Sequence, residues 1–255
     1  MKGLVLAAGK GERLRPLTES IPKPMLELGG RPLIHYALRM LKRAGITQIA
    51  INVHHLAGQI ETGLRTGHEL GLEVTYAPET ELLGTGGPLL GLREFFDSEP
   101  FVVANSDTLM DLDLSAMLRF HRNHGSVATF ALYRPPDMSA YSELEIDNEG
   151  RLRRMRLITG GRHGEFEDFP AEAPSVPVEA YMFCGLYICE PQVHQWMPQG
   201  LPFSSMKDLF APMVARGMPL FGYVHQGLFR TVDDLAAYES LKREFAANPQ
   251  LLEGL

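Results

Sequence analysis

The first half of the chain alternates short apolar runs typical of buried β-strands with stretches of helical periodicity. A strand–helix–strand unit winds in a right-handed sense and leaves its two strands parallel. The alternation therefore predicts an α/β fold with a mixed, mostly parallel sheet and flanking helices. Expected strands are Lys2–Ala8, Gln48–Val53, Leu72–Tyr76, Phe101–Ala104 and Val127–Tyr133; expected helices are Leu33–Ala44, Ala57–Leu64, Gly87–Phe96 and Ser115–His124, the last with Ser115 as its N-cap.

The second half of the chain is less regular. Asp147–Gly150 lies between two strand-like runs, which indicates a hairpin. The segment Thr159–Pro177 is rich in Gly, Pro, Glu and Asp, so we expect a long loop that is suited to act as a lid. The remaining expected elements are strands at Glu143–Ile146, Leu152–Leu157 and Tyr181–Ile188, and helices at Met206–Arg216 and Asp234–Phe245.

A loop rich in glycine and arginine directly follows the first apolar run. Gly9 and Gly11 let the backbone approach a ligand closely, and Arg13 adds a planar cation suited to phosphate. Lys23 follows in a Pro-Lys-Pro tripeptide. Ligands of parallel sheets bind beyond the carboxyl ends of the strands. This loop therefore predicts a site for a triphosphate.

Two other phosphate-binding loops are excluded by spacing. A Walker loop needs Gly-x-x-x-x-Gly-Lys-Ser/Thr, which the chain does not contain. The dinucleotide fingerprint needs a third glycine three residues after the second, where this chain has Leu14, and Pro16 follows. The loop thus belongs to neither class.

The string Leu-Ala-Ala-Gly-Lys-Gly-Glu-Arg-Leu-Arg-Pro-Leu-Thr, followed by Pro-Lys-Pro, resembles the signature of the sugar-1-phosphate nucleotidyltransferases. The resemblance extends from Met1 to about Tyr238. It implies a Rossmann-like nucleotide-diphospho-sugar transferase fold in one domain, 1–255, with a nucleotide-binding half at 1–135 and a sugar-phosphate-binding half at 136–255. Within the family the chain looks most like mannose-1-phosphate guanylyltransferases and N-acetylmuramate-1-phosphate uridylyltransferases.

The resemblance also implies roles for individual residues. Arg13 is expected to hold the leaving pyrophosphate, and Lys23 to lie between the α-phosphate and the sugar phosphate. Tyr141 and Gly185 match positions near the sugar phosphate. The lysine that grips this phosphate in many relatives is absent, and Arg153, Arg154 or Arg156 is a candidate replacement or a solvated strand face. The implied nucleotide site comprises Leu6, Ala7, Ala8, Gly9, Gly11, Glu79, Gly84 and Thr85.

Glu79 matches the family position that reads the base edge. An ionised carboxylate only accepts hydrogen bonds. Guanine offers two adjacent donors and uracil or thymine offers one, whereas adenine and cytosine present an acceptor there. Glu79 therefore favours GTP, then UTP or dTTP, if it faces the base. The alternative is an exposed acidic side chain without this role.

Asp107 matches the family's magnesium-binding aspartate, and carboxylates are ligands that Mg²⁺ prefers. The second family carboxylate is missing, because Thr231 occupies its position and Asp233 lies two residues further on. Three readings follow. In the first, Asp233 completes the metal site. In the second, Asp107 is the one carboxylate that binds Mg²⁺, and Thr231 lies beyond the direct ligands of the ion. In the third, the enzyme is weakened.

Composition narrows the function classes. The net charge is −7 and there is no long basic run, which argues against a nucleic-acid partner. No apolar segment approaches the roughly 20 residues that span a bilayer, so we expect no membrane partner. The two cysteines, Cys184 and Cys189, form no metal motif, and we expect a cytoplasmic protein.

The expected reaction transfers a nucleotidyl group from a nucleoside triphosphate to a sugar 1-phosphate, with a lean to GTP and a mannose-1-phosphate-like acceptor, or to UTP. A catalytically weak regulatory subunit that binds nucleotide sugars is the alternative, and transfer to a non-sugar phosphate such as phosphocholine is another. The oligomeric state stays open, a homo-oligomer being one option.

Overall fold

The computed structural model describes residues 1–160 and 164–255. The chain divides into two compact units. The first unit comprises Met1–Leu82, Val102–Leu114 and Gly227–Leu255. The second comprises Leu83–Phe101 and Ser115–Gln226.

The first unit contains a parallel sheet. Strand β4 (Gln48–Val53) pairs in parallel with β1 (Lys2–Leu6) on one side and with β5 (Glu73–Pro78) on the other. Strand β6 (Phe101–Asn105) neighbours β1. The central residues of β1 and β4 are buried without alternation, as expected for strands covered on both faces.

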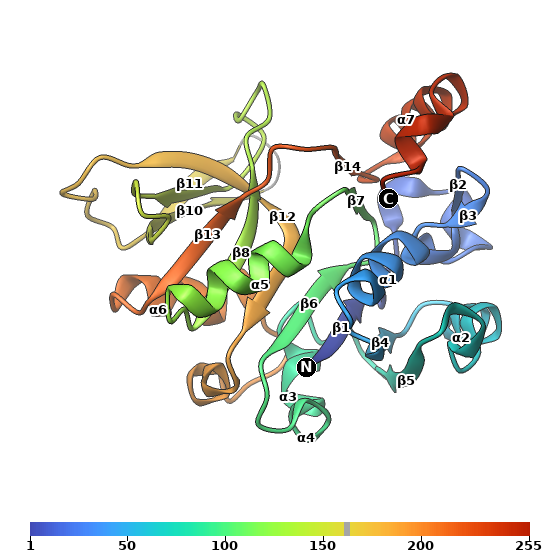
Figure 1. The fold of residues 1–255 in the computed structure, drawn as a ribbon, viewed down its shortest axis with the longest axis horizontal. Coiled ribbons are helices and arrows are strands. Elements are labelled where there is room, and N and C mark those ends of the chain that lie inside the picture. The colour runs from blue at the N-terminus through green and yellow to red at the C-terminus, as the bar shows by residue number, and fades with distance from the viewer. Residues whose placement is uncertain (161–163) are drawn as a thin grey trace. The chain divides into compact units, whose positions relative to one another are not determined.

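Three α-helices belong to the first unit: α1 (Ile34–Arg43), α2 (Ala57–Leu64) and α7 (Leu235–Ala247), labelled in Figure 1. Helix α1 packs on β1 and on β7 (Thr108–Met110). It buries Ile34, Leu38 and Leu41, which lie on one face because they follow a helical repeat. Two small antiparallel sheets join β7 to β14 (Phe229–Thr231) and β2 (Glu27–Leu28) to β3 (Arg31–Pro32).

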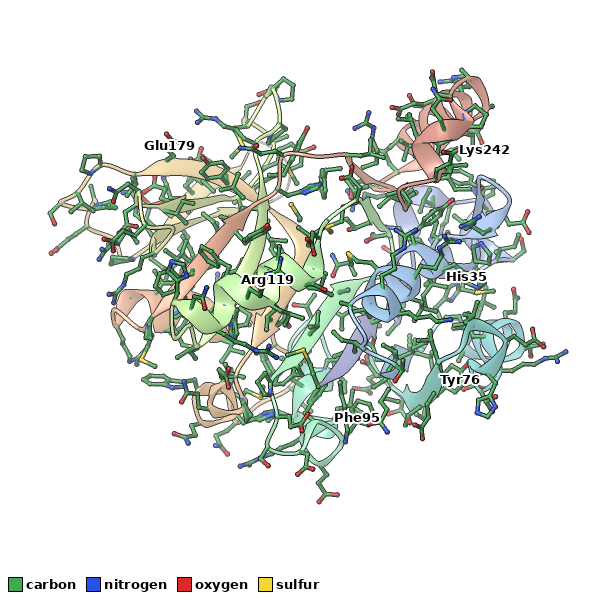
Figure 2. All side chains as sticks on the ribbon, viewed as in Figure 1. His35, Tyr76, Phe95, Arg119, Glu179 and Lys242 are labelled. Atoms are coloured by element: carbon green, nitrogen blue, oxygen red, sulfur yellow. The ribbon has the colours of Figure 1, made fainter. Side chains whose placement is uncertain are left out.

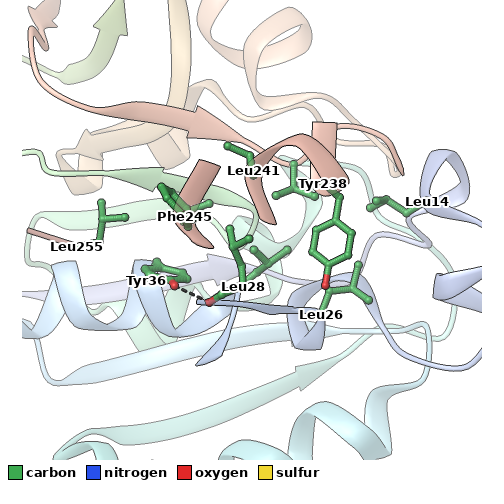
Figure 3. Close-up of a cluster of buried hydrophobic side chains, with 11 residues drawn as sticks. Leu14, Leu26, Leu28, Tyr36, Tyr238, Leu241, Phe245 and Leu255 are labelled. Atoms are coloured by element: carbon green, nitrogen blue, oxygen red, sulfur yellow. Dashed lines mark hydrogen bonds between the residues drawn. The ribbon is translucent and has the colours of Figure 1, made fainter. Parts of the chain in front are cut away.

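A hydrophobic cluster joins α7 to the N-terminal loops (Figure 3). Leu14 and Leu26, which both follow the glycine-rich loop in the chain, lie in it with Phe245 of α7. The hydroxyl of Tyr238 donates to the carbonyl of Glu27 at 2.6 Å, and the hydroxyl of Tyr36 donates to the carbonyl of Leu28 at 2.6 Å. The loops of the candidate site are therefore anchored on a packed core.

The second unit contains the strands β8 (Ala128–Tyr133), β9 (Glu143–Ile146), β10 (Leu152–Thr159), β11 (Glu165–Phe169), β12 (Glu179–Cys189) and β13 (Leu220–Val224). Strand β12 is antiparallel to both β8 and β9, β10 is antiparallel to β9 and β11, and β13 is parallel to β8. The mixed sheet that we expected is confirmed, and its antiparallel pairs are concentrated in this unit.

The helices of the second unit are α3 (Gly87–Gly91), α4 (Arg93–Phe96), α5 (Leu114–Asn123) and α6 (Ala211–Ala215). The first residue of α5, Leu114, is counted with the first unit. A π-helical stretch, Ser205–Phe210, leads into α6. Short 3₁₀ turns in the two units cover Glu12–Leu14, Leu17–Glu19, Lys23–Met25, His68–Leu70, Pro191–Trp196 and Pro249–Leu252.

Three helix predictions were wrong in detail. Ser115 is not the N-cap, because α5 begins at the buried Leu114 and Asp113 precedes it. The expected helix Gly87–Phe96 is two short helices, since Leu92 leaves the helical region with φ −99° and ψ 12°. The expected helix Met206–Arg216 is π-helical in its first half, where the side chain of Ser204 caps the amide of Lys207.

The expected loop Thr159–Pro177 contains strand β11. This strand pairs with β10, and its Asp168 lies beside Arg154 and Arg156, so cross-strand ion pairs stabilise an acidic segment that reads as a loop. Residues 161–163 of the expected lid lie outside the described residues.

Among the described residues, no helix combines the length and the hydropathy needed to span a bilayer.

Candidate active site

The glycine-rich loop follows β1 directly. Ala7 and Ala8 are buried, and the chain then emerges at Gly9. Gly11 has φ +64°, a conformation that L-residues rarely adopt. A Cβ atom on Gly11 would lie 2.9 Å from Cγ2 of Thr18 and 3.1 Å from Cβ of Lys23. Since the hydroxyl of Thr18 also donates to the carbonyl of Gly11 at 2.9 Å, the loop is folded tightly against residues 18–23.

Lys23 and Asp107, the expected phosphate and metal ligands, form an ion pair through Nζ and Oδ2. Both side chains are mostly buried, with exposed fractions of 14% and 20%. Asp107 follows the buried strand β6 and precedes β7. The amide of Ser106 donates to the carbonyl of Leu6 at 3.2 Å, which fixes the end of β6 beside the start of the glycine-rich loop.

Asp233 lies in the same neighbourhood because β14 pairs with β7. Thr231 is opposite Thr108, and the amide of Val232 donates to the carbonyl of Asp107 at 3.1 Å. The carboxylate of Asp233 lies 3.9 Å from Nη2 of Arg13 and accepts a hydrogen bond from the hydroxyl of Thr231 at 3.3 Å. Each carboxylate expected to bind metal thus faces a cation expected to bind phosphate.

The neighbouring Asp234 has a structural role. Its carboxylate caps α7 by accepting from the amide of Ala237 at 2.9 Å. Within the described part of the chain, no group of three or more His, Cys, Asp or Glu side chains is arranged to hold a metal ion. A magnesium ion with two carboxylates would complete its shell with phosphates and water, which agrees with this donor set.

Glu79 follows β5 and is buried, with an exposed fraction of 9%. The alternative of an exposed acidic side chain was therefore wrong. The side-chain amide of Asn52 donates to Oε1 of Glu79 at 2.8 Å, and its carbonyl oxygen accepts from the amide of Ala7 at 2.9 Å. Asn52 thus links the carboxylate to the glycine-rich loop.

Sequence reasoning missed Asn52. It is a buried polar side chain, 3% exposed, in the otherwise apolar end of β4. Buried polar groups almost always bond to a partner, so an asparagine in such a strand was the available signal.

Gly84 and Thr85 belong to the second unit. Gly84 has φ +77°, and a Cβ there would lie 2.3 Å from the carbonyl oxygen of Phe203. The hydroxyl of Thr85 accepts from the amide of Ser205 at 2.9 Å and lies 3.1 Å from its hydroxyl. The loop is therefore fixed against residues 203–205, and the Thr85 hydroxyl already has partners in the protein.

Tyr141 and Gly185, the expected sugar-phosphate residues, also lie in the second unit. The amide of Tyr141 donates to the carbonyl of Met138 at 3.0 Å. Gly185 has φ +79° where the register between β12 and β8 shifts, which marks a β-bulge. These observations describe the local backbone of the two residues, and they do not identify either residue as a ligand of the sugar phosphate.

The three candidate arginines of β10 all have carboxylate partners. Arg153 pairs with Asp147 at 2.6 Å. Arg154 pairs with Glu145 at 2.7 Å, and Arg156 pairs with Glu143 at 2.6 Å. Burial is the largest single effect on the pKa of Asp147 and raises it. Hydrogen bonds and the Arg153 charge together outweigh burial, so the pKa lies below its ordinary value. These arginines form an ion-pair network on the sheet, so we do not assign them to the sugar phosphate.

The comparison with protein families matches the nucleotidyl transferase family over residues 2–229. UTP–glucose-1-phosphate uridylyltransferase from Synechocystis is 34% identical, covering 87% of this chain and 57% of its own length. Mannose-1-phosphate guanyltransferase beta-B from Xenopus laevis is 33% identical, covering 91% of this chain and 61% of its own length. The chain thus spans about three fifths of these relatives.

Solved structures show the same fold. A putative glucose-1-phosphate thymidylyltransferase from Bacillus anthracis superimposes with a TM-score of 0.78 at 21% identity, covering 96% of this chain and 94% of its own. HddC from Yersinia pseudotuberculosis gives a TM-score of 0.75 at 22% identity, covering 96% and 99%. The glycine-rich loop and the match over residues 2–229 agree: the chain belongs to the nucleotidyl transferase family.

Proposed function

We propose that this protein transfers a nucleotidyl group from a nucleoside triphosphate to a sugar 1-phosphate. An oxygen of the sugar phosphate attacks the α-phosphorus, the bond from that phosphorus to the bridging oxygen breaks, and pyrophosphate leaves. The observation that carries the proposal is the convergence of the glycine-rich loop, Lys23, Arg13 and two carboxylates in the first unit. The named sequence relatives act on glucose 1-phosphate and mannose 1-phosphate, which supports this acceptor class.

The residues act by position and charge, since the reaction requires no protein nucleophile. Loop amides near Gly9 and Gly11 and the guanidinium of Arg13 hold the departing phosphates. Lys23, which is mostly buried, neutralises the α-phosphate as the acceptor approaches. Leu6, Ala7 and Ala8 shape the nucleotide site in the first unit. Gly84 and Thr85, for the nucleotide, and Tyr141 and Gly185, for the acceptor, belong to the second unit, and their roles are proposed from the family resemblance.

Asp107 and Asp233 would hold a magnesium ion. When bound, this ion supplies positive charge that neutralises the phosphates in the transition state. The β7–β14 pairing, which puts Val232 against Asp107, supports Asp233 as the second ligand over the readings in which Asp107 acts alone or the enzyme is weakened.

Two cation–carboxylate pairs lie at the site. Lys23 pairs with Asp107, and Arg13 lies near Asp233. Substrate phosphates would attract the two cations and leave both carboxylates for the metal ion.

Glu79 would select the base. Asn52 orients its carboxylate and satisfies part of its hydrogen-bonding capacity. An ionised carboxylate has about four acceptor positions, so the bond from Asn52 leaves capacity for guanine N1–H and N2–H. We therefore favour GTP with a mannose-1-phosphate-like acceptor, and UTP second.

A matrix of GTP, UTP, dTTP, CTP and ATP against several sugar 1-phosphates, read by pyrophosphate release with purified protein, tests the proposal. We expect turnover with GTP or UTP and at least one hexose 1-phosphate. A protein that binds nucleotide sugars but releases no pyrophosphate with any pair would instead be the regulatory subunit.

A further inference from the structure

A strongly basic cavity lies along α1 in the first unit. Its volume is about 430 Å³. The basic side chains that line it are Arg31, Arg39, Lys42 and Arg43, together with His35. Figure 2 labels His35 on this helix. The lining includes neither the glycine-rich loop nor Lys23, Asp107, Asp233 or Glu79, so the cavity is separate from the candidate active site.

Helix periodicity gathers these charges. His35, Arg39 and Lys42 follow one another at spacings of four and three residues, which places them on one face of α1. Arg31 reaches the same cavity from β3, just before the helix. The face opposite to them on α1 carries the apolar residues that pack on the sheet.

The cations of this cavity are poorly matched by anions. Nη1 of Arg31 is buried without a hydrogen-bond partner in the described residues. Arg39 has neither an ion pair nor a hydrogen bond from its side chain within residues 1–160 and 164–255. Lys42 donates to the carbonyl of Leu70 at 2.6 Å. Arg43 donates to the carbonyl of Gly254 at 2.6 Å and to the oxygen of Leu255 at 3.0 Å.

One carboxylate borders the cavity. Glu69 is 83% exposed and pairs with Arg65, outside the lining, at 3.3 Å. Among the residues that line the cavity, four Arg and Lys side chains and one carboxylate therefore occur together, in a protein whose net charge is −7. The local excess of positive charge opposes the charge of the whole chain.

The cations also repel one another. Burial, followed by the charges of Arg31 and Arg43, lowers the pKa of Arg39. Burial, followed by the charges of Arg31 and Arg39, lowers the pKa of His35. A bound anion would relieve this repulsion.

We propose that the cavity along α1 binds a small phosphorylated molecule that carries at least two anionic groups. Guanidinium groups match phosphate with paired hydrogen bonds, and a single anion would leave several cations unmatched. Leu38, Leu70 and Leu72 supply an apolar surface for a carbon skeleton. The volume lies within the range of about 300–1,000 Å³ that is usual for small-molecule sites.

Calorimetric titration with inorganic pyrophosphate tests the proposal. Wild type should show two sites. The double variant Arg13→Ala/Lys23→Ala should retain the site along α1. Arg39→Gln should retain the catalytic site, and its affinity for pyrophosphate at the site along α1 should fall about tenfold or more, the scale of one charge-assisted contact. One site in wild type, abolished by Arg13→Ala/Lys23→Ala and unaffected by Arg39→Gln, would overturn the proposal.

Matched variants separate charge from folding. Lys42→Gln removes a second cation, at the exposed rim of the cavity, and should also weaken binding. Arg39→Lys should bind pyrophosphate more tightly than Arg39→Gln, because it keeps the positive charge. Arg122→Gln removes an exposed arginine from α5 and should change nothing. Unfolding curves of the Arg39, Lys42 and Arg122 variants should coincide with wild type, and the turnover of these variants should be unchanged. Equal loss of binding in Arg122→Gln would show a non-specific charge effect and refute the site.

The Arg13→Ala/Lys23→Ala protein, which should keep the site along α1, is used to compare ligands. ADP, glucose 6-phosphate and pyrophosphate are each titrated into it. Binding of ADP or pyrophosphate with glucose 6-phosphate at least tenfold weaker supports a ligand with two anionic groups. A glutamate-rich peptide that binds in an Arg39-dependent manner more tightly than any of the three would make the cavity a protein-docking surface and overturn the small-molecule proposal.

Discussion

The bond network of Asn52 gives the sharpest test of how the fold holds the candidate site. Replacing Asn52 with Ala removes two buried hydrogen bonds, one from the amide of Ala7 and one to the carboxylate of Glu79. Ala7 is 3% exposed and Glu79 is 9% exposed, so water reaches neither group easily. An abandoned buried donor costs about 1–3 kcal/mol, and a lost bond to a charged group about 1.5–3 kcal/mol.

The free energy of unfolding of Asn52→Ala should therefore fall by about 2.5–6 kcal/mol. For a chain of this size the melting temperature should fall by about 5–24 °C, at about 2–4 °C per kcal/mol. Urea and thermal unfolding, followed by circular dichroism, measure both quantities. If Glu79 reads the base, the KM for the nucleoside triphosphate should rise as well, because the carboxylate loses its orientation.

Two further variants isolate the causes. Asn52→Asp keeps an acceptor for Ala7 but places a second carboxylate beside Glu79, so its loss of stability reports the Glu79 contact. Gln48→Ala removes an exposed amide on the same strand, which donates to Glu73 at 3.1 Å, and should change stability by less than about 0.5 kcal/mol. An unfolding free energy of Asn52→Ala within that same margin would refute the reasoning.

Four other predictions concern the site and the core. Arg13→Ala or Lys23→Ala should each lower kcat/KM by about 100-fold or more, as for loss of a preorganised charge contact; near-normal turnover in steady-state assays would remove that residue from the mechanism. Glu79→Gln should lower turnover of GTP more than that of UTP, and a wild-type preference for ATP or CTP would contradict the base assignment. Asp107→Asn and Asp233→Asn should both severely lower Mg²⁺-dependent turnover in an Mg²⁺ titration, whereas a nearly silent Asp233→Asn would show that Asp107 acts without it. His194 is stacked on Phe96 and Phe101 with both ring nitrogens buried and unpartnered among the described residues, and burial, followed by the charge of Arg93, lowers its pKa. Because the folded state then binds fewer protons than the unfolded state, stability should fall as the pH drops below about 6.5; His194→Phe should flatten this slope between pH 7.5 and 5.5 in urea titrations, and an unchanged slope would show that His194 does not contribute to it.

The sequence by itself determined the parts of the protein that follow from local pattern. Strand β4 and helix α2 have the expected bounds, Gln48–Val53 and Ala57–Leu64, because apolar periodicity is a local property. The family followed from one unbroken N-terminal string. The identities of Gly11, Arg13, Lys23 and Asp107 as candidates needed no coordinates, since they lie within or directly after recognisable motifs.

Only the tertiary structure decided how distant segments meet. The second carboxylate was ambiguous in the sequence, because its motif is displaced by two residues. The pairing of β14 with β7, more than 115 residues apart in the chain, brings Asp233 to the level of Asp107 and leaves Asp234 to cap α7. Likewise, β11 is stabilised as a strand because the carboxylate of its Asp168 pairs with two arginines of β10. The composition of the segment does not reveal these partners. The partners of Asn52, and the approach of Arg31 to the basic face of α1, depend on contacts across the fold, which the local pattern of the sequence does not give.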